Sequence, residues 1–342
     1  MSEHPDDRLR DEGGGSRSVR IAVDAMGGDH APAVQVEGAL SAVRELDGLE
    51  VVLVGRRDAL EAELRKHDGG RSAVSVVHAD EVIEMDEVPA NAVRKKRGAS
   101  LVVAAELHKR GDVDGLVSAG NTGAVVASAL LSLGKLPKVR RPAIASLFPT
   151  LRESGVLIDV GACVDSRPSD LLTFAAMGET YARSVLGRDD PRVALMNIGA
   201  ESHKGSGLTQ TAYGLLSESP LNFVGNIEGT TLLEGQADVV VCDGFVGNVM
   251  LKMIEGTIGM LKSMAHGDPA SIGLGILSEQ LDYAEHGGAP LLGIDGVVVI
   301  AHGGSSVKAI KNAVGVAARF VNVGLGGAIA DRMREVVTAN VR

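Results

Sequence analysis

Short runs rich in Val and Ile recur along almost the whole chain, and they limit the possible folds more than any other feature of the sequence. Their length and apolar character are typical of strands buried on both faces of a sheet. Amphipathic stretches of helical length lie between many of them, which predicts a doubly wound, mostly parallel sheet with helices on both faces. The predicted strands are Val19 to Val23, Val51 to Val54, Val74 to Val77, Leu116 to Val117, Val156 to Val160, Val193 to Met196, Val239 to Val241 and Val297 to Ala301. The predicted helices are Ala33 to Glu45, Asp58 to His67, Leu101 to Lys109, Thr122 to Leu133, Leu171 to Leu186 and Val249 to Met264.

The chain has 342 residues, 45% of them apolar, which is enough for one α/β domain over residues 19–342 or for two lobes. Residues 1–18 are polar and charged and predict a disordered tail without the apolar core of a signal peptide. The longest apolar stretch, Ala124 to Leu133, is far shorter than the roughly 20 residues of a membrane span. We therefore expect a cytoplasmic protein, with peripheral contact to the membrane left open. Cys163 and Cys242 are expected to be free thiols, as in a reducing cytosol.

The composition argues against nucleic acid as a partner. The formal net charge is −10, whereas proteins that neutralise phosphate backbones carry a basic field. Aromatic residues make up 2% of the chain and Trp is absent, so there is little to stack on bases. An anionic ligand has to be met by local groups.

Glycine-rich turns directly follow several predicted strands. They read D-A-M-G-G-D at Asp24 to Asp29, S-A-G-N-T-G at Ser118 to Gly123, N-I-G-A-E at Asn197 to Glu201 and C-D-G-F-V-G-N at Cys242 to Asn248. In an open α/β sheet such turns meet at the carboxyl ends of the strands, where ligands bind. The pattern predicts one polar cleft assembled from distant segments.

Two of these turns suit an anion. Gly27 and Gly28, flanked by Asp24 and Asp29, let backbone amides approach a ligand closely, although a plain capped turn explains them equally well. A helix is expected to start near Asn121 or Thr122, and its first amides would form a phosphate-sized anion hole or carry only an ordinary cap.

A cation is available in H-K-G-S-G, directly after another strand. Lys204 in this loop is the candidate partner for the anion, and a solvated surface lysine is the alternative. Further polar candidates for the cleft also follow apolar runs: Ser118, Asn197, Asn226, Glu228, Asp243, Asn248 and His302. For His302, a structural imidazole and a catalytic one remain open.

Several signatures of other enzyme classes are missing. The sequence contains no G-x-x-x-x-G-K-[ST] loop, no G-x-G-x-x-G that opens a βαβ unit, no G-x-S-x-G elbow and no H-E-x-x-H motif. Cys163 and Cys242 stand in no recognisable nucleophile motif and resemble buried fillers. A parallel α/β enzyme without these motifs needs another chemistry.

Five runs of residues occur in order over nearly the whole chain, from about Val19 to Lys311: I-A-V-D-A-M-G-G-D-H-A-P at Ile21 to Pro32, V-S-A-G-N-T-G-A at Val117 to Ala124, R-P-A at Arg141 to Ala143, C-D-G-F-V-G-N-V at Cys242 to Val249 and G-G-A-P-L-L-G at Gly287 to Gly293. Together they closely resemble the bacterial phosphate acyltransferases that use acyl carrier protein.

The resemblance implies the fold of the isocitrate dehydrogenase and phosphotransacetylase superfamily, a dimer, and no metal, nucleotide or other cofactor. It also implies that phosphate attacks the thioester of an acylated carrier protein, so no Ser or Cys nucleophile is needed. On this basis Lys204 and the amides near Asn121 and Thr122 would hold phosphate, and Asn248 would orient the thioester. Asp24 and Asp29 would shape the site. The implied partners are acyl carrier protein, inorganic phosphate, and at the membrane a downstream glycerol-3-phosphate acyltransferase.

The chain departs from the family pattern at four places. Cys163 stands where the family usually has Asn, Ala99 where it has the first Ser of a pair, Ala200 where it has Glu, and Thr231 where an Asp is common. The segment at 262–281 is also shorter and less basic than the amphipathic stretch of the family, which weakens the expectation of membrane docking.

An acidic enzyme and an acidic carrier protein need a local positive patch in order to dock. Two basic runs are candidates: Arg94, Lys95, Lys96 and Arg97, and Lys135, Lys138, Arg140 and Arg141. Solvated charge runs without a partner are the alternative. Two other functions remain open: a phosphotransacetylase that acts on short acyl-CoA, and a catalytically silent scaffold of lipid-synthesis enzymes.

Overall fold

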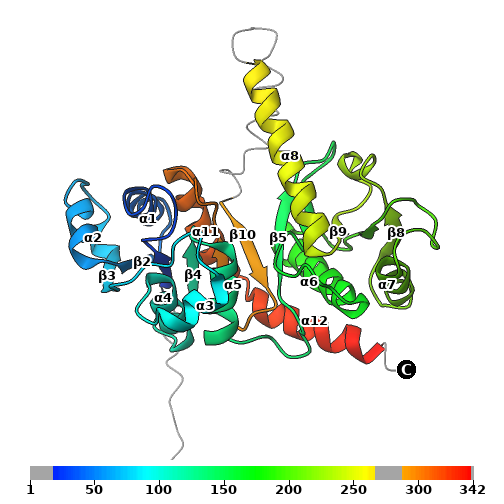
Figure 1. Cartoon of the computed structure of the whole chain (residues 1–342), viewed down its shortest axis with the longest axis horizontal. Coiled ribbons are helices and arrows are strands. Elements are labelled where there is room, and N and C mark those ends of the chain that lie inside the picture. The colour runs from blue at the N-terminus through cyan, green and yellow to red at the C-terminus, as the bar shows by residue number, and fades with distance from the viewer. Residues whose placement is uncertain (1–17, 266–286, 340–342) are drawn as a thin grey trace, which may run out of the picture.

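The computed structural model describes residues 18–265 and 287–339, which form one extended sheet covered by helices (Figure 1). The sheet has eleven strands within these ranges. In spatial order they are β3 (Val74–His78), β2 (Leu49–Gly55), β1 (Val19–Asp24), β4 (Gly115–Ser118), β11 (Val298–Ile300), β10 (Ala289–Leu292), β5 (Ala143–Phe148), β6 (Gly155–Ile158), β9 (Val239–Val241), β7 (Val193–Met196) and β8 (Phe223–Ile227).

The sheet consists of two parallel blocks joined by antiparallel pairs. Strands β3, β2, β1, β4 and β11 form the first block, and β6, β9, β7 and β8 form the second. Between the blocks, β10 pairs antiparallel with β11 and β5, and β5 pairs antiparallel with β6. The strand direction reverses three times between β11 and β6, so the strands of the two blocks run in opposite directions.

Each face of the sheet has its own apolar core, because successive strand residues point to opposite sides. In β1, Ile21 and Val23 face one side and Ala22 faces the other. The first core packs under α1 (Ala33–Glu45), α2 (Arg57–Leu64), α6 (Pro168–Leu186), α7 (Gly207–Ser217), α11 (Val307–Asn322) and α12 (Leu325–Ala339). The second packs under α3 (Pro89–Lys95), α4 (Ser100–Lys109), α5 (Thr122–Ser132) and α8 (Gly244–Ala265). The predicted doubly wound, mostly parallel sheet is therefore confirmed.

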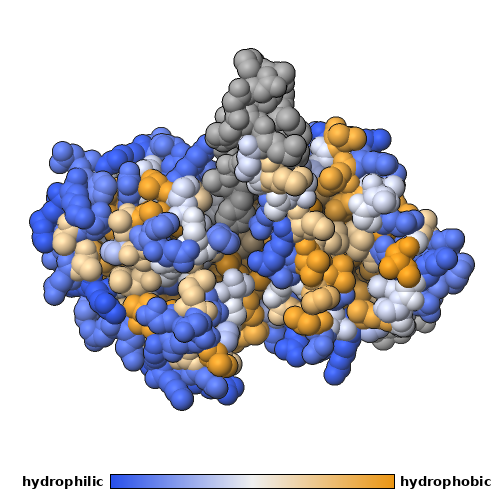
Figure 2. Space-filling view, turned by 45° about the horizontal axis from the view of Figure 1, so that its top comes forward, coloured by the Kyte–Doolittle hydropathy of each residue, from blue (hydrophilic) through white to orange (hydrophobic). Residues whose placement is uncertain are grey.

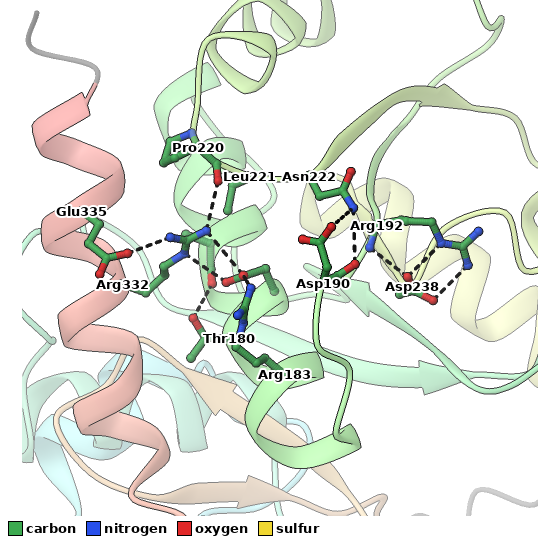
Figure 3. Close-up of polar contacts among 12 residues, drawn as sticks. Thr180, Arg183, Asp190, Arg192, Pro220, Leu221, Asn222, Asp238, Arg332 and Glu335 are labelled. Carbon is green, nitrogen blue, oxygen red and sulfur yellow. Dashed lines mark hydrogen bonds and ion pairs between the residues drawn. The ribbon is translucent and has the colours of Figure 1, made fainter.

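Helix α12 is held on α6 by a buried carboxylate (Figure 3). Glu179 of α6 accepts hydrogen bonds from Arg332 Nε at 3.1 Å and from Arg183 Nη2 at 2.7 Å. Arg332 also donates to the carbonyl of Pro220 at 3.3 Å and to Glu335 at 2.7 Å. One guanidinium thus joins three segments that are distant in the sequence.

Within the described ranges, no single helix has both the length and the apolar character needed to cross a membrane; α11 and α12, bent by 55°, reach them only as a pair. The predicted tail at 1–18 falls almost entirely outside the described residues. Most of the segment at 262–281, on which the prediction of membrane docking rests, lies outside them as well.

Candidate active site

The predicted site residues lie in three clusters at the carboxyl ends of the strands. The Asp24 cluster follows β1, β4 and β11; the Asp159 cluster follows β6 and β9; the Asn197 cluster follows β7 and β8. Within each cluster the strands are parallel neighbours, so their ends lie side by side. The Asp24 cluster belongs to one parallel block and the other two clusters to the block of opposite sense, so a single cleft formed by all three stays a prediction. The first cluster contains Asp24, Gly27, Gly28, Asp29, Ser118, Asn121, Thr122 and His302, the second Asp243 and Asn248, and the third Asn197, Lys204, Asn226 and Glu228.

Asp24 is the buried centre of its cluster. Its Oδ1 accepts a hydrogen bond from the Ser100 hydroxyl at 2.6 Å, and its Oδ2 accepts one from the Ser118 hydroxyl at 2.7 Å. Burial raises the pKa of Asp24 above its ordinary value, against the opposing effect of these hydroxyls and of nearby backbone amides. Ser100 was not predicted. It directly follows Ala99, so the departure from the Ser pair leaves the serine that bonds to Asp24 in place.

The turn after β1 is packed too closely for side chains. A Cβ on Gly27 would lie 2.7 Å from Asp24 Oδ2 and 2.8 Å from the amide nitrogen of Gly120. Gly28 has φ +105°, which only glycine adopts without strain. The carbonyl of Gly27 accepts a hydrogen bond from Gln35 Nε2 at 2.6 Å, which fixes the turn. The turns after β1 and β4 are thus in direct contact, as a shared ligand site requires.

The loop after β11 borders the same turn. The amide of Asp29 donates to the carbonyl of Gly303 at 2.9 Å. His302 is exposed, and its Nδ1 accepts the Gly304 amide at 3.1 Å. The imidazole therefore lies at the rim of the Asp24 cluster, with one ring nitrogen engaged in the loop.

The start of α5 has the predicted cap. Asn121 is the N-cap residue, and its Oδ1 accepts the Ala124 amide at 3.1 Å. Its Nδ2 donates to the carbonyls of Met85 and Glu87 at 2.9 and 3.2 Å, so it also ties down the loop before α3. The amides of Thr122 and Gly123 have no acceptor among the residues that the structure describes, and they remain available to an anion.

Asp159, directly after β6, is a second buried carboxylate, and it was not predicted as a site residue. It is 0% exposed and accepts the amides of Ile144, Gly161, Ala162 and Cys163 at 2.6–3.1 Å. Burial raises the pKa of Asp159, while these amides act in the opposite direction. The sequence contains a pattern that could have identified Asp159, because this residue follows an apolar run and begins a D-V-G-A turn. Cys163 contributes a backbone amide, so its replacement of Asn does not remove this contact.

The second cluster also includes the start of α8. Asp243 Oδ1 accepts the amides of Phe245 and Val246 at 3.0 Å each, so Asp243 caps this helix. Asn248 is half-buried and faces the turn after β6: a Cβ on Gly161 would lie 3.7 Å from its Oδ1. Cys242 is buried, and burial raises the pKa of its thiol well above the ordinary value, so the thiol stays protonated and is a poor nucleophile. Both cysteines are free, as predicted.

Lys204 belongs to an anchored loop in the third cluster. Its carbonyl accepts a hydrogen bond from Asn197 Nδ2 at 3.1 Å, and its amide donates to the carbonyl of Glu201 at 3.1 Å. Asn226 Nδ2 donates to the same carbonyl at 2.9 Å. The side chain of Lys204 is exposed, and its ammonium contacts no carboxylate among the described residues. Asn226 Oδ1 is buried and has no hydrogen-bond partner among the described residues, so one polar atom beside the loop is left unsatisfied.

The two basic runs contain both engaged and exposed side chains. Lys96 donates to the Val82 carbonyl at 2.8 Å and is ion-paired with Glu87, and Arg140 forms a two-bond ion pair with buried Asp170. Lys135 donates to the Arg140 carbonyl at 3.0 Å. The other members are exposed: Arg94, Lys95, Arg97, Lys138 and Arg141.

The sequence of this chain is similar to those of a known protein family. The model of a family described as "Fatty acid synthesis protein" matches residues 19–326. The phosphate acyltransferase of Heliobacterium modesticaldum is 50% identical over 331 residues, covering 92% of this chain and 98% of the relative. That of Desulfitobacterium hafniense strain DSM 10664 is 49% identical over 319 residues, covering 90% and 95%.

Solved structures show the same fold at low identity. The EutD phosphotransacetylase of Staphylococcus aureus has a TM-score of 0.60 and 18% identity, over 89% of this chain and 94% of its own. The phosphotransacetylase of Streptococcus pyogenes has the same values. The fold is thus that of the phosphotransacetylases. By sequence, the chain belongs to the fatty acid synthesis protein family, and the two relatives named above are phosphate acyltransferases.

Proposed function

We propose that the protein transfers a fatty acyl group from acyl carrier protein to inorganic phosphate. A phosphate oxygen attacks the thioester carbonyl, forming a C–O bond. The C–S bond then breaks, and the carrier leaves as a thiolate that takes up a proton. The products are acyl phosphate, a precursor for phospholipid synthesis, and free carrier thiol.

The observation that carries this proposal is the arrangement around Lys204. Its backbone is fixed by Asn197 and Glu201, whereas its ammonium is left without a carboxylate among the described residues. No carboxylate of the described residues therefore competes with a phosphate dianion for this cation.

The other clusters supply positioning in this proposal. The open amides of Thr122 and Gly123 form a second anion site at the carboxyl end of the other parallel block, and Asn248 donates from its amide to the thioester oxygen, where negative charge develops. Asp24 and Asp159 act through the turns that they fix. His302, at the rim, is the candidate to protonate the leaving thiolate.

The cellular setting follows from the family likeness and is part of the proposal. The protein works as a cytoplasmic homodimer, in peripheral contact with the inner face of the membrane. There it passes acyl phosphate to a glycerol-3-phosphate acyltransferase. Chemical cross-linking of the purified protein and flotation with anionic vesicles test these two features separately.

Phosphate-dependent thiol release from hexadecanoyl carrier protein tests the reaction. We expect release without added metal or nucleotide, and an equal rate in EDTA. Acetyl-CoA and hexadecanoyl-CoA, assayed in parallel, separate this activity from that of a short-chain phosphotransacetylase. Loss of activity in EDTA that a divalent ion restores would overturn the metal-free mechanism, and carrier binding without thiol release would point to a scaffold.

A further inference from the structure

An apolar groove of about 520 Å³ runs along α8. It is bounded by α8, the end of β5 and the loop after β8, in the half of the molecule where Figure 2 shows apolar surface gathered. Its walls are formed by Pro149, Gly229, Leu232, Leu233, Val249, Met250, Met253, Ile254, Thr257 and Ile258. The volume lies within the range of about 300–1,000 Å³ that is usual for small-molecule sites.

The side chains that line the groove offer an occupant no free polar group. Thr257 is the one hydroxyl residue of the lining, and its Oγ1 already donates to the carbonyl of Met253 at 2.8 Å. Large apolar side chains are left uncovered, with Met253 70%, Val249 51% and Leu233 45% exposed. A concave apolar surface of this kind favours a hydrocarbon ligand.

The groove adjoins the candidate active site through two of its lining residues. Gly229 directly follows Glu228 of the Asn197 cluster, and Val249 directly follows Asn248 of the Asp159 cluster. A ligand that lies in the groove and extends past these two residues therefore brings its head to the polar groups proposed for the reaction.

We infer that this groove binds the hydrocarbon chain of the fatty acyl donor, with the thioester at the end marked by Glu228 and Asn248. The inference rests on the proposed function, because it takes the donor to be a fatty acyl thioester. The continuity with the polar clusters favours a substrate chain over a second protein copy, which would not need to reach the active site.

The groove can be shortened without disturbing the fold. A Cβ on Gly229 would meet no atom within 4 Å, and its φ lies outside the left-handed region, so Gly229→Leu places its side chain in open space at the groove. Gly256→Leu is the matched control: Gly256 also has open space around its Cβ and lies on α8, but it does not line the groove. Met253→Glu is a second variant, and its exposed position tolerates a charge.

The measurement is kcat/KM for octanoyl, dodecanoyl and hexadecanoyl carrier protein. In the parent we expect it to rise with chain length, by up to about fourfold for each methylene that becomes buried, from about 0.8 kcal/mol per methylene. Gly229→Leu and Met253→Glu should each lower the hexadecanoyl-to-octanoyl ratio at least tenfold, while Gly256→Leu keeps the parent ratio.

The outcomes separate the two proposals. A parent that releases no thiol from any donor refutes the proposed function. A parent that is active but whose chain-length dependence is unchanged in both groove variants refutes the groove as the acyl site. If light scattering then shows that Gly229→Leu alters the oligomeric state, the groove is a contact between subunits.

Discussion

At the scale of single residues, Lys204 combines a fixed backbone with an exposed ammonium. If this ammonium holds phosphate, Lys204→Ala should lower kcat/KM for phosphate by roughly tenfold to a hundredfold, since a hydrogen bond to a charged group contributes about 1.5–3 kcal/mol. Steady-state kinetics with varied phosphate measures this, and Lys109→Ala, at an exposed lysine that ends α4, is the control. Equal kinetics in both variants would mean that the anion binds elsewhere.

The raised pKa of Asp24 predicts how the stability of the protein depends on pH. Its folded-state pKa is raised by burial, so its contribution to stability is fully present below the unfolded value of 3.8 and is lost as pH rises through the folded pKa. The parent should therefore lose stability as pH rises from about 4, and Asp24→Asn should not. The free energy of unfolding of Asp24→Asn should increase relative to that of the parent over this range.

Urea unfolding at a series of pH values tests this dependence. Asp68→Asn, at an exposed position, removes one charge without touching a buried carboxyl and serves as the control. A difference between Asp24→Asn and the parent that stays constant or shrinks with rising pH would contradict the raised pKa.

The sequence predicted the site residues that stand in glycine turns, but not their partners. Asn121 was identified as a helix cap because the cap pattern is local, and the structure confirms it. Ser100 bonds to Asp24 from a position 76 residues away, and such a contact has no local signature. The roles of Lys204, Asn248 and His302 stay predictions, because they depend on a bound substrate.

At the scale of elements, the contact between α12 and α6 depends on Arg332. Arg332→Met keeps the apolar stem but removes two of the donors to Glu179, which is buried. Breaking a buried pair is costly, and Arg183 still contacts the carboxylate, so we expect a loss of about 2–3 kcal/mol in the free energy of unfolding.

Chemical denaturation measures this loss against Arg334→Met. Arg334 pairs with Asp331 on the same helix at 2.9 Å, but both side chains are about two-thirds exposed, so that pair contributes about 0–1 kcal/mol. Adding Glu179→Gln to Arg332→Met should recover part of the stability, because it removes the charge left behind. Equal losses in the two single variants would refute the role of Arg332.

Sequence patterns found the parallel strands and missed others for a physical reason. All eight predicted strands are present, whereas β5, β8 and β10 were not predicted. Strands β5 and β10 are the antiparallel pair that joins the two blocks, and no crossover helix separates β10 from β11 or β5 from β6 to mark them. Helix α11 was not predicted although it is strongly amphipathic, because it follows the last Val-rich run of the chain and does not lie between two of them.

At the scale of the whole molecule, an acidic protein has to dock an acidic carrier through local charge. In the first basic run, the candidates for docking the carrier are the exposed side chains of Arg94, Lys95 and Arg97, because Lys96 is ion-paired with Glu87. Helix α3, which ends in this run, contacts α5 at its start: a Cβ on Gly123 would come 2.6 Å from Pro89. The patch is thus separated from the open amides proposed for phosphate by the length of α3, about 10 Å.

Replacing Lys95 and Arg97 by Glu should raise KM for the carrier protein roughly tenfold at low salt and leave KM for phosphate unchanged. The difference should shrink as salt rises, because exposed charges are screened beyond about 10 Å at 0.1 M. Arg65→Glu with Lys109→Glu, at exposed positions elsewhere, controls for net charge. If the first pair of substitutions has no effect on KM for the carrier, Lys138 and Arg141 are replaced by Glu in the same test. No effect of either pair would refute docking through these runs.

The position of β11 in the sheet also sets the order in which the molecule can be completed during synthesis. Strand β4 ends at Ser118, but its neighbour β11 begins at Val298, and α11, which contacts α1 where Gly38 meets Ile310, follows later still. At about 5–20 residues per second, a ribosome needs on the order of ten seconds or more between them. The nascent amino-terminal half spends this time with an open strand edge and an uncovered apolar helix face, the surfaces that chaperones bind.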